Sequence, residues 1–160
     1  MRDISLHILD IIQNSIVANA SLIEISINED EQTDSLTVTI KDNGKGMCKE
    51  LLERVTDPYT TNRTTRKVGL GISLLKQNAE RSGGELNISS ELGVGTILTV
   101  KFIPSNIDCL TLGDIAGVLA ITVSGNPLID FIYNHKINGT LYSFNTKEIK
   151  EILEGISIGE

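Results

Sequence analysis

Two polar side chains, Asp10 and Asn14, stand out in an isoleucine-rich segment near the start of the chain, and His7 lies on the same face of the predicted helix. Asp10 and Asn14 are four residues apart, so a helix places them on one side, one turn from each other. An amide in the middle of an isoleucine-rich helix is unfavourable unless it has a partner or a ligand. The pair indicates either a solvent-facing stripe or part of a binding site, and the spacing alone favours neither.

A second candidate is the turn-rich loop at residues 42–47, which holds Asp42 and two glycines. An aspartate at the end of a strand can accept a hydrogen bond from an exocyclic amine such as N6 of adenine. Gly44 and Gly46 let the backbone approach a ring without a clash of a Cβ atom. Taken alone, this loop is more typical of an ordinary turn.

A third candidate is the Gly-Leu-Gly turn at residues 69–71, which directly precedes a predicted helix. Such a turn exposes backbone N–H groups at the positive end of the helix dipole, a combination that suits phosphates. Arg63, Arg66 and Lys67 add the positive charge that a triphosphate requires. A Gly-x-Gly turn is weak evidence by itself, and the later segment 93–96 is also typical of a tight β-turn.

The hydrophobic pattern predicts the elements that position these residues. Apolar residues at helical spacing predict helices, and alternating apolar and polar residues predict strands. In chain order, we expect a helix at 4–19, strands at 22–27 and 36–42, a short helix at 49–55, a helix at 71–81 and strands at 86–90 and 96–102. The polar stretches 28–35 and 56–68 are expected to be loops. This order predicts an α+β fold, a two-layer sandwich with helices on one face of a mixed, mostly antiparallel sheet.

Residues 105–160 form a second, smaller region. After a linker at 104–108, we expect a helix at 112–124 with Thr111 as its cap, a hairpin turning at Asn138-Gly139, and a short helix at 147–154. This helix-hairpin-helix extension is interpreted either as a cap packed on the domain or as an element for partner docking or homodimerisation. The second interpretation rests on residues 112–123, which are apolar on nearly all sides.

Composition excludes several classes of function. The net charge of −7 and the pI of about 4.8 argue against a nucleic-acid-binding surface, which needs a broad basic patch. No stretch reaches the length of a membrane-spanning helix, and the first residues are not those of a signal peptide. Cys48 and Cys109 are far apart and form no metal-binding pair, so we expect two reduced thiols in a cytoplasmic protein.

Together these segments resemble the conserved boxes of the histidine-kinase-like ATPase (GHKL) family, which includes histidine kinases, DNA gyrase B, mismatch-repair ATPases and heat-shock chaperone ATPases. The resemblance covers residues 4–104, so we divide the chain into an ATP-binding domain at 1–104 and an extension at 105–160. It is closest to the branch of the histidine kinases and anti-sigma serine kinases. The motifs that carry it are Asp57-Pro58-Tyr59-Thr60-Thr61, Gly69-Leu70-Gly71-Ile72-Ser73-Leu74-Leu75-Lys76, Gly83-Gly84 and Ser90-Glu91-Leu92-Gly93-Val94-Gly95-Thr96. The implied fold is the Bergerat-type ATP-binding fold.

The resemblance implies ATP and Mg²⁺ as cofactors, with Asn14 binding the metal through its side-chain oxygen. Asp42 is implied to bind adenine N6, with help from Thr96 through a water, while Met47 packs near the base. The remaining residues implied to contact the nucleotide form the adenine wall, the lid and the phosphate turn: Gly44, Gly46, Thr60, Thr61, Arg63, Arg66, Lys67, Gly69, Leu70 and Gly71.

One departure from the family concerns catalysis. The family usually has Glu where this chain has Asp10, whose carboxylate is implied to orient or deprotonate the attacking group. Because Asp is one carbon shorter, weak catalysis and a role limited to ordering magnesium-bound water both remain open. We also expect residues 60–68 to be mobile without nucleotide and ordered by the γ-phosphate.

No phosphoacceptor segment precedes the first helix, and His7 and His135 lie in no phosphoacceptor motif. We therefore expect a stand-alone catalytic module, a protein kinase or slow ATPase with a regulatory role, acting on a protein partner. The alternative is a regulatory module whose ATP occupancy changes partner affinity without turnover. Asp10 is the residue that distinguishes the two.

Overall fold

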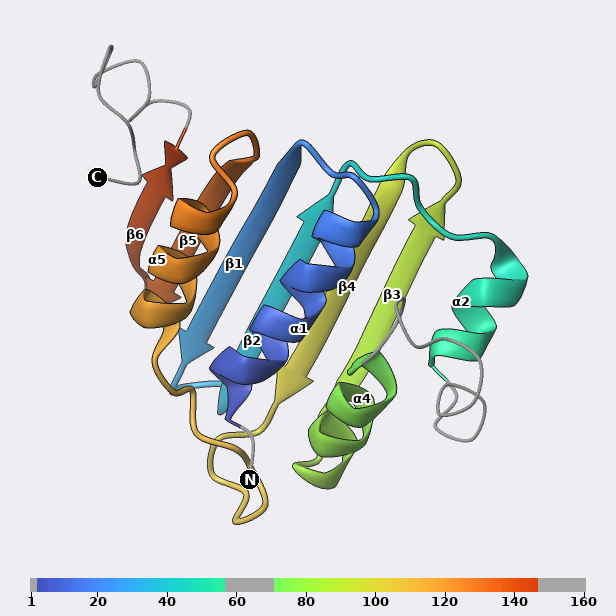
Figure 1. Cartoon of the computed structure of the whole chain (residues 1–160). Helices are drawn as coiled ribbons and strands as arrows, with labels where there is room; N and C mark the ends of the chain where they lie inside the picture. Colours follow the sequence, from blue (N-terminus) through green and yellow to red (C-terminus); the bar gives the residue numbers. More distant parts are fainter. Residues whose placement is uncertain (1–2, 57–70, 147–160) are drawn as a thin grey trace.

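The computed structural model describes residues 3–56 and 71–146 of the 160-residue chain. Within these residues, helices lie along one face of a single open sheet (Figure 1). The helices are α1 (Ile4–Val17), α2 (Lys49–Val55), α4 (Ile72–Arg81) and α5 (Ile115–Gly125). The strands are β1 (Leu22–Asp30), β2 (Ser35–Asp42), β3 (Glu85–Glu91), β4 (Gly95–Phe102), β5 (Asp130–Ile137) and β6 (Thr140–Asn145).

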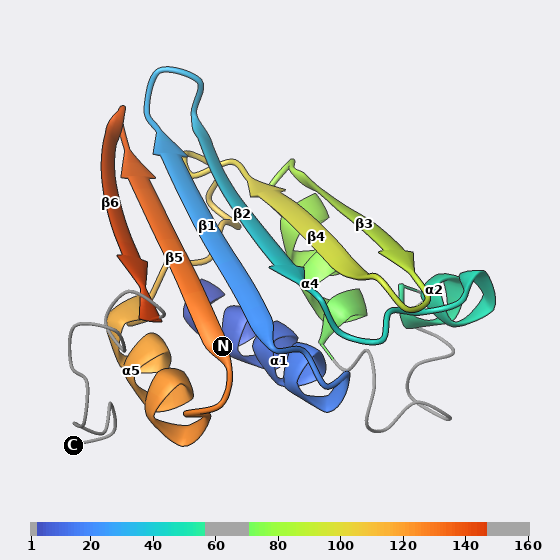
Figure 2. The same cartoon turned by 90° about the horizontal axis from the view of Figure 1, so that it is seen from above.

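The sheet has the strand order β3-β4-β2-β1-β5-β6. Every neighbouring pair is antiparallel except β1 and β5, which run parallel. Viewed from above, α1, α4 and α5 occupy one side of the sheet (Figure 2). The predicted α+β sandwich with a mixed, mostly antiparallel sheet is therefore confirmed.

The core lies between α1 and the two central strands. Ile23, Ile25 and Ile27 of β1 alternate with polar residues, and each is at most 1% exposed. They face the side of α1 that buries Ile8 and Ile12. Because successive side chains of a strand point to opposite faces, this alternation fixes which face of the sheet the helix covers.

The first hairpin is longer than its hydrophobic pattern indicated. Pairing continues past the apolar residues to Asp30 and Ser35, so only four residues form the turn where an eight-residue loop was expected. Backbone pairing at polar positions, such as Asn28 opposite Thr37, accounts for the difference. The hydrophobic alternation stops before the backbone ladder does.

The start of α1 is capped from two directions. The Asp3 carboxylate accepts hydrogen bonds from the Leu6 N–H at 3.0 Å and the Ser5 hydroxyl at 2.6 Å, and the Ser5 bond in particular lowers the pKa of Asp3. The N–H groups of Ile4 and Ser5 donate to the carbonyls of Thr111 and Leu112, at 2.9 and 2.8 Å. The segment between β4 and α5 thus holds the first turn of α1.

This use of residues 111 and 112 explains why the predicted cap of the later helix is wrong. α5 begins only at Ile115, and Asp114 is its cap, accepting from the Gly117 N–H at 2.9 Å. The backbone of Gly113 has a φ of +81°, which ends any helical run from Thr111. A helix starting there would also remove the carbonyl acceptors that α1 uses.

The C-terminal hairpin turns at Asn138-Gly139, as predicted, with φ values of +47° and +90°. It does not lie on the domain as a cap. β5 pairs with β1 over eight residue pairs, which makes the hairpin part of the main sheet and buries Phe131 completely.

A polar chain reinforces the junction of β1 and β5. Nε2 of His135 lies 2.6 Å from Glu29, and the Tyr133 hydroxyl lies 2.7 Å from Nδ1 of His135. Burial, with a smaller contribution from the Glu29 charge, raises the pKa of Tyr133 to about 12.

Candidate functional site

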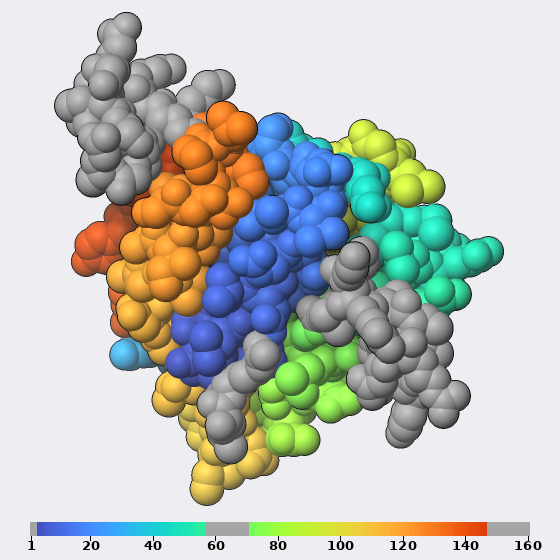
Figure 3. Space-filling view, in the orientation of Figure 1, coloured from blue at the N-terminus to red at the C-terminus, as the bar shows by residue number. Residues whose placement is uncertain are grey.

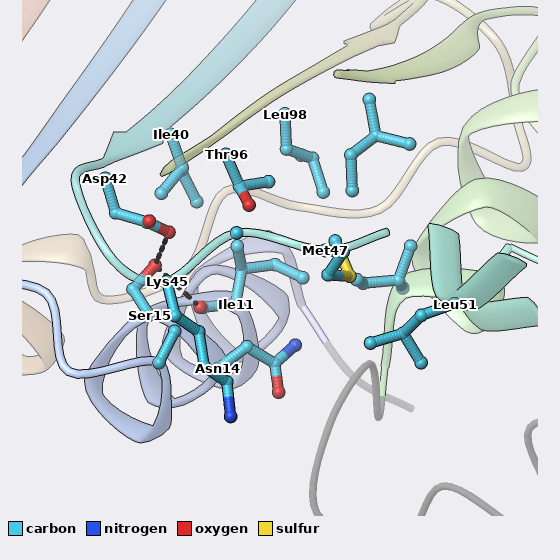
Figure 4. Close-up of a pocket in the computed structure, with 14 residues that line it drawn as sticks. Ile11, Asn14, Ser15, Ile40, Asp42, Lys45, Met47, Leu51, Thr96 and Leu98 are labelled. Atoms are coloured by element: carbon cyan, nitrogen blue, oxygen red, sulfur yellow. Dashed lines mark hydrogen bonds between the residues drawn. The ribbon is translucent and has the colours of Figure 1, made fainter. Parts of the chain in front are cut away.

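A cavity opens between α1, the ends of β2 and β4, and the loop after β2 (Figure 4). Its apolar wall comes from both layers of the fold, namely Ile11, Ile40, Leu51, Ile72, Ile88 and Leu98. The polar and loop residues on its lining are Asn14, Ser15, Asp42, Lys45, Gly46 and Thr96, with Met47 beside them. An apolar slot with a few convergent polar groups is the usual form of a small-molecule site.

Asp42 has both carboxylate oxygens occupied. The Ser15 hydroxyl donates to Oδ2 at 2.6 Å, and the Gly44 N–H donates to Oδ1 at 2.9 Å. Ser15 is only 2% exposed, so its hydroxyl is held in the core side of the cavity. The carboxylate is therefore fixed at the end of β2, where it can accept a hydrogen bond from an amine in the cavity.

Ser15 was not identified from the sequence. Its partner lies 27 residues further along the chain, a distance that no local pattern reveals. The available signal was a serine next to Asn14 on the buried face of an isoleucine-rich helix.

Thr96 lies directly opposite Asp42 in the pairing of β2 with β4. Its hydroxyl is 2.8 Å from the Ser90 hydroxyl, which also accepts from the Met47 N–H at 2.8 Å and donates to the Gly95 carbonyl at 3.1 Å. Ser90 thus connects two residues of the cavity lining. Its role was also missed, since it depends on the hairpin of β3 and β4 meeting the loop after β2.

The glycines of the 42–47 loop have a structural function. A side chain at Gly44 would press on Ala18, the C-cap of α1, with a Cβ atom 2.8 Å from the Ala18 carbonyl oxygen. Gly46 has a φ of +72°, and a Cβ atom there would clash with the Glu91 carbonyl. The loop is held between the end of α1 and the turn after β3, since Lys45 N–H donates to the Ala18 carbonyl at 2.8 Å.

Asp10 and Gly71 meet at the start of α4. Gly71 has a φ of +89°, and a Cβ atom on it would lie 3.1 Å from Asp10 Oδ2. The Asp10 carboxylate therefore lies beside the N-terminal end of α4, one helix turn along α1 from Asn14. Asp10 is not among the residues that line the cavity itself.

His7, on the same helix, is buried in the contact between α1 and α4. It is 1% exposed, and its Nε2 lies 2.9 Å from the side-chain nitrogen of Asn78 on α4. This contact joins the two helices that border the site.

Seven predicted nucleotide contacts fall on residues 57–70, outside the described part of the chain: Thr60, Thr61, Arg63, Arg66, Lys67, Gly69 and Leu70. The prediction that residues 60–68 are mobile without nucleotide also concerns residues outside the described part of the chain. Among the described residues, the structure brings together Asn14, Asp42, Gly46, Met47 and Thr96 around one cavity.

The metal expected at Asn14 was tested against the side chains present. No group of three or more His, Cys, Asp or Glu residues that could hold a metal occurs in the described residues. Magnesium prefers oxygen ligands and is commonly bound by few protein groups together with phosphates and water. A single amide oxygen on the cavity wall, with Asp10 one turn away, fits that mode of binding.

The fold and the cavity are those of a small-molecule-binding protein, and comparison with known proteins identifies its family. Residues 2–107 match the family of histidine kinase-, DNA gyrase B- and HSP90-like ATPases. The chain belongs to this family. ATP binding follows from that membership.

The relatives with curated descriptions include sensor kinases. The chain is 31% identical over 85 residues to a putative sensor histidine kinase NtrY-like of Rickettsia bellii (strain RML369-C), covering 53% of this chain and 13% of the relative. It is 33% identical over 85 residues to the histidine protein kinase SaeS of Staphylococcus aureus (strain USA300), covering 50% and 24%. It is 26% identical over 97 residues to the sensor histidine kinase YvrG of Bacillus subtilis (strain 168), covering 58% and 17%. The match thus spans at most 24% of the length of these relatives. Among the described helices of our chain, none has the length and apolarity needed to cross a membrane.

Proposed function

We propose that the chain binds Mg-ATP in this cavity and acts as a stand-alone catalytic module, a protein kinase or slow ATPase that regulates a protein partner. The observation that carries the proposal is the fixed Asp42 carboxylate, held by Ser15 and Gly44 at the end of an apolar slot. An immobilised acceptor in such a slot suits a flat base with an exocyclic amine. Adenine has this amine at N6, whereas guanine has a carbonyl at the equivalent position.

In this proposal Asp42 accepts from N6 of adenine, and Thr96 assists through a water molecule. Met47 packs near the base. Gly44 and Gly46 give the loop its path along the base, because side chains at these positions would displace it from α1 and from β3. The cavity thereby selects the nucleoside part of the ligand.

The phosphates would lie towards the start of α4, whose N-terminal N–H groups favour negative charge. Gly71 lies at that position, and Gly69 and Leu70 precede it in the chain. We propose that Asn14 binds Mg²⁺ through its amide oxygen. Thr60, Thr61, Arg63, Arg66 and Lys67 are proposed as the remaining phosphate contacts.

For catalysis we propose Asp10, which lies beside Gly71 at the end of the site where the phosphates are placed. Bound magnesium would neutralise phosphate charge. The Asp10 carboxylate would accept the proton of an attacking water or hydroxyl group, and such general-base assistance is typically worth about 10²–10⁴ in rate.

A second candidate function is a regulatory module that binds ATP without turnover. It is favoured by the short side chain of Asp10, which lies against Gly71 and outside the lining of the cavity. In either case, we propose a cytoplasmic protein without nucleic-acid or membrane partners. Two cysteines that form no disulfide and a net charge of −7 support this placement.

The deciding experiment is incubation of the purified full chain with γ-labelled ATP, with and without Mg²⁺. Label in free phosphate or on protein supports an enzyme, and binding without transfer supports the regulatory module. Failure of millimolar Mg-ATP to raise the melting temperature would contradict nucleotide binding here altogether.

Two substitutions separate binding from turnover. Asn14→Ala removes the proposed metal ligand and should weaken Mg-ATP binding. Asp10→Asn should lower turnover about 10²-fold or more, and leave Mg-ATP affinity unchanged or slightly higher because a negative charge near the phosphates is lost. Unchanged turnover in Asp10→Asn would show that this carboxylate is not the base.

A further inference from the structure

The two edges of the sheet differ in how they are protected. The edge strand β3 begins with Glu85 and ends with Glu91, and both side chains are exposed. Charged residues on an edge strand discourage pairing with another chain. The opposite edge strand, β6, has the sequence Thr-Leu-Tyr-Ser-Phe-Asn, without a charge or a proline.

β6 also exposes apolar side chains on both of its faces. Tyr142 and Phe144 pair with His135 and Tyr133 of β5, so they lie on the helix-bearing face, where they are 59% and 38% exposed. Leu141 points to the other face and is 59% exposed. The strand lies at the margin of the molecule in Figures 1 and 3, and no described strand pairs with its outer side.

The local charge favours a second copy of the chain as the occupant of this edge. The chain has a net charge of −7, but β6 itself carries no charged side chain, and residues 115–145 contain only Asp130 and Lys136. The nearby acidic residues are Glu29, which contacts His135, and Asp30 and Glu31, which lie at the tip of the hairpin beside Asn138. Along β6 itself, two copies therefore meet with less repulsion than an approach through the acidic parts of the surface would produce. The same strand also supplies the apolar residues that a partner strand would need on each face.

We propose that two copies of the chain associate by antiparallel pairing of β6 with β6. The two-fold axis is perpendicular to the sheet, so both copies keep their helices on the same side and form one sheet of twelve strands, six from each. In a register centred on Ser143, Tyr142 lies opposite Phe144 of the second copy. This register makes two aromatic cross-strand pairs on the helix-bearing face.

The interface lies apart from the nucleotide cavity. None of the residues of β5 and β6 lines that cavity, and two strands, β5 and β1, separate β6 from β2, where Asp42 lies. The proposal therefore does not depend on ATP binding. The area buried by pairing one six-residue strand is small compared with the interfaces of about 1,600 Å² in stable complexes. We therefore expect a dissociation constant in the micromolar range.

Sedimentation velocity of the full chain between about 1 and 300 μM, a range around the micromolar dissociation expected for a small interface, tests the proposal. We expect a monomer–dimer equilibrium that Ser143→Lys abolishes, since the two-fold axis brings the two lysines together. Asn87→Lys is the matched control, because Asn87 is an exposed polar residue in the middle of the other edge strand. A wild-type monomer at every concentration would overturn the proposal, as would a dimer that survives Ser143→Lys or is lost in Asn87→Lys.

A chemical cross-link tests the register. In a background with Cys48→Ser and Cys109→Ser, Ser143→Cys should form a covalent dimer with a short reagent that joins two thiols, because directly opposed Cβ atoms lie about 5 Å apart. Asn87→Cys should not. Failure of Ser143→Cys to cross-link would refute this register. If the wild type is monomeric and the amides of Leu141 and Ser143 are protected from hydrogen exchange, the edge is instead covered by the chain's own residues 147–160, and the proposal is wrong.

Discussion

The hydrogen bond from Ser15 to Asp42 allows a sharp test of the proposed adenine site. Ser15→Ala removes the hydroxyl that holds Oδ2 of Asp42 at 2.6 Å and leaves the carboxylate with only the Gly44 N–H. In the empty protein, water in the cavity can take the place of the hydroxyl. A bound base excludes this water, so the loss appears mainly as weaker binding.

The magnitude follows from the charge on the acceptor. A hydrogen bond to a charged group contributes about 1.5–3 kcal/mol, and the lower end applies because water partly compensates. Since about 1.4 kcal/mol corresponds to a factor of ten in a dissociation constant, Ser15→Ala should weaken ATP binding about tenfold. Isothermal titration calorimetry with a non-hydrolysable ATP analogue and Mg²⁺ measures this directly.

α1 contains an unusually close control. Ser5 is also 2% exposed, and its hydroxyl also donates to an aspartate, Asp3, at 2.6 Å. Ser5→Ala therefore removes an equivalent bond from the same helix but away from the cavity. It should lower the melting temperature and leave ATP affinity within about twofold of the wild type, a difference well under 1 kcal/mol. Equal affinity loss in both variants, or none in Ser15→Ala, would refute the assignment of Asp42 as a positioned base-binding carboxylate.

Three further outcomes are expected. Asp42→Asn is nearly isosteric but turns an acceptor towards adenine N6 into a donor. It should weaken ATP binding at least about tenfold in calorimetry, with an unchanged circular dichroism spectrum. Equal affinity of the wild type for GTP and ATP would contradict the role of Asp42 in selecting adenine. Gly71→Ala places a side chain on a residue with a φ of +89°, beside Asp10, and should destabilise the fold by about 1–2 kcal/mol in urea unfolding. An unchanged midpoint of urea unfolding would show that alanine is tolerated at this position without strain. The pKa of Tyr133 is raised from 10 to about 12, so its neutral form stabilises the fold below pH 10 and this contribution is lost as the pH rises towards 12. Tyr133→Phe should therefore make the free energy of unfolding less dependent on pH in this range. An unaltered pH dependence in the variant would contradict a buried environment for Tyr133.

The sequence predicted the elements that local periodicity specifies. Alternation at Ile23, Ile25 and Ile27 identified β1, and the position of Asp42 at a strand end was correct. The parallel pairing of β5 with β1 was not predicted, because a period of two marks a strand without naming its neighbour. The C-terminal hairpin was interpreted as a cap because the sequence did not show that β5 pairs with β1.

For the site too, local motifs identified some residues, whereas residues with distant partners were not recognised. Asn14, Asp42 and Thr96 were identified through motifs, and the structure places all three on one cavity. Ser15 was not identified and the role of Ser90 was missed, because their partners are 27 and 43 residues away in the chain. A serine is common in helices and strands alike, so only the folded chain distinguishes these two from the others.

The bonds from Ile4 and Ser5 to residues 111 and 112 bear on how the protein can be divided for experiments. The match to the ATPase family ends at residue 107, which invites a shortened chain. Such a fragment would lose the carbonyl acceptors for the first turn of α1 and would expose the whole edge of β1, where β5 now pairs. Bare edges of this kind promote aggregation. The segment that matches the family is thus smaller than the unit joined by this sheet and these hydrogen bonds, and expression of the ATPase part should retain residues through the end of β6.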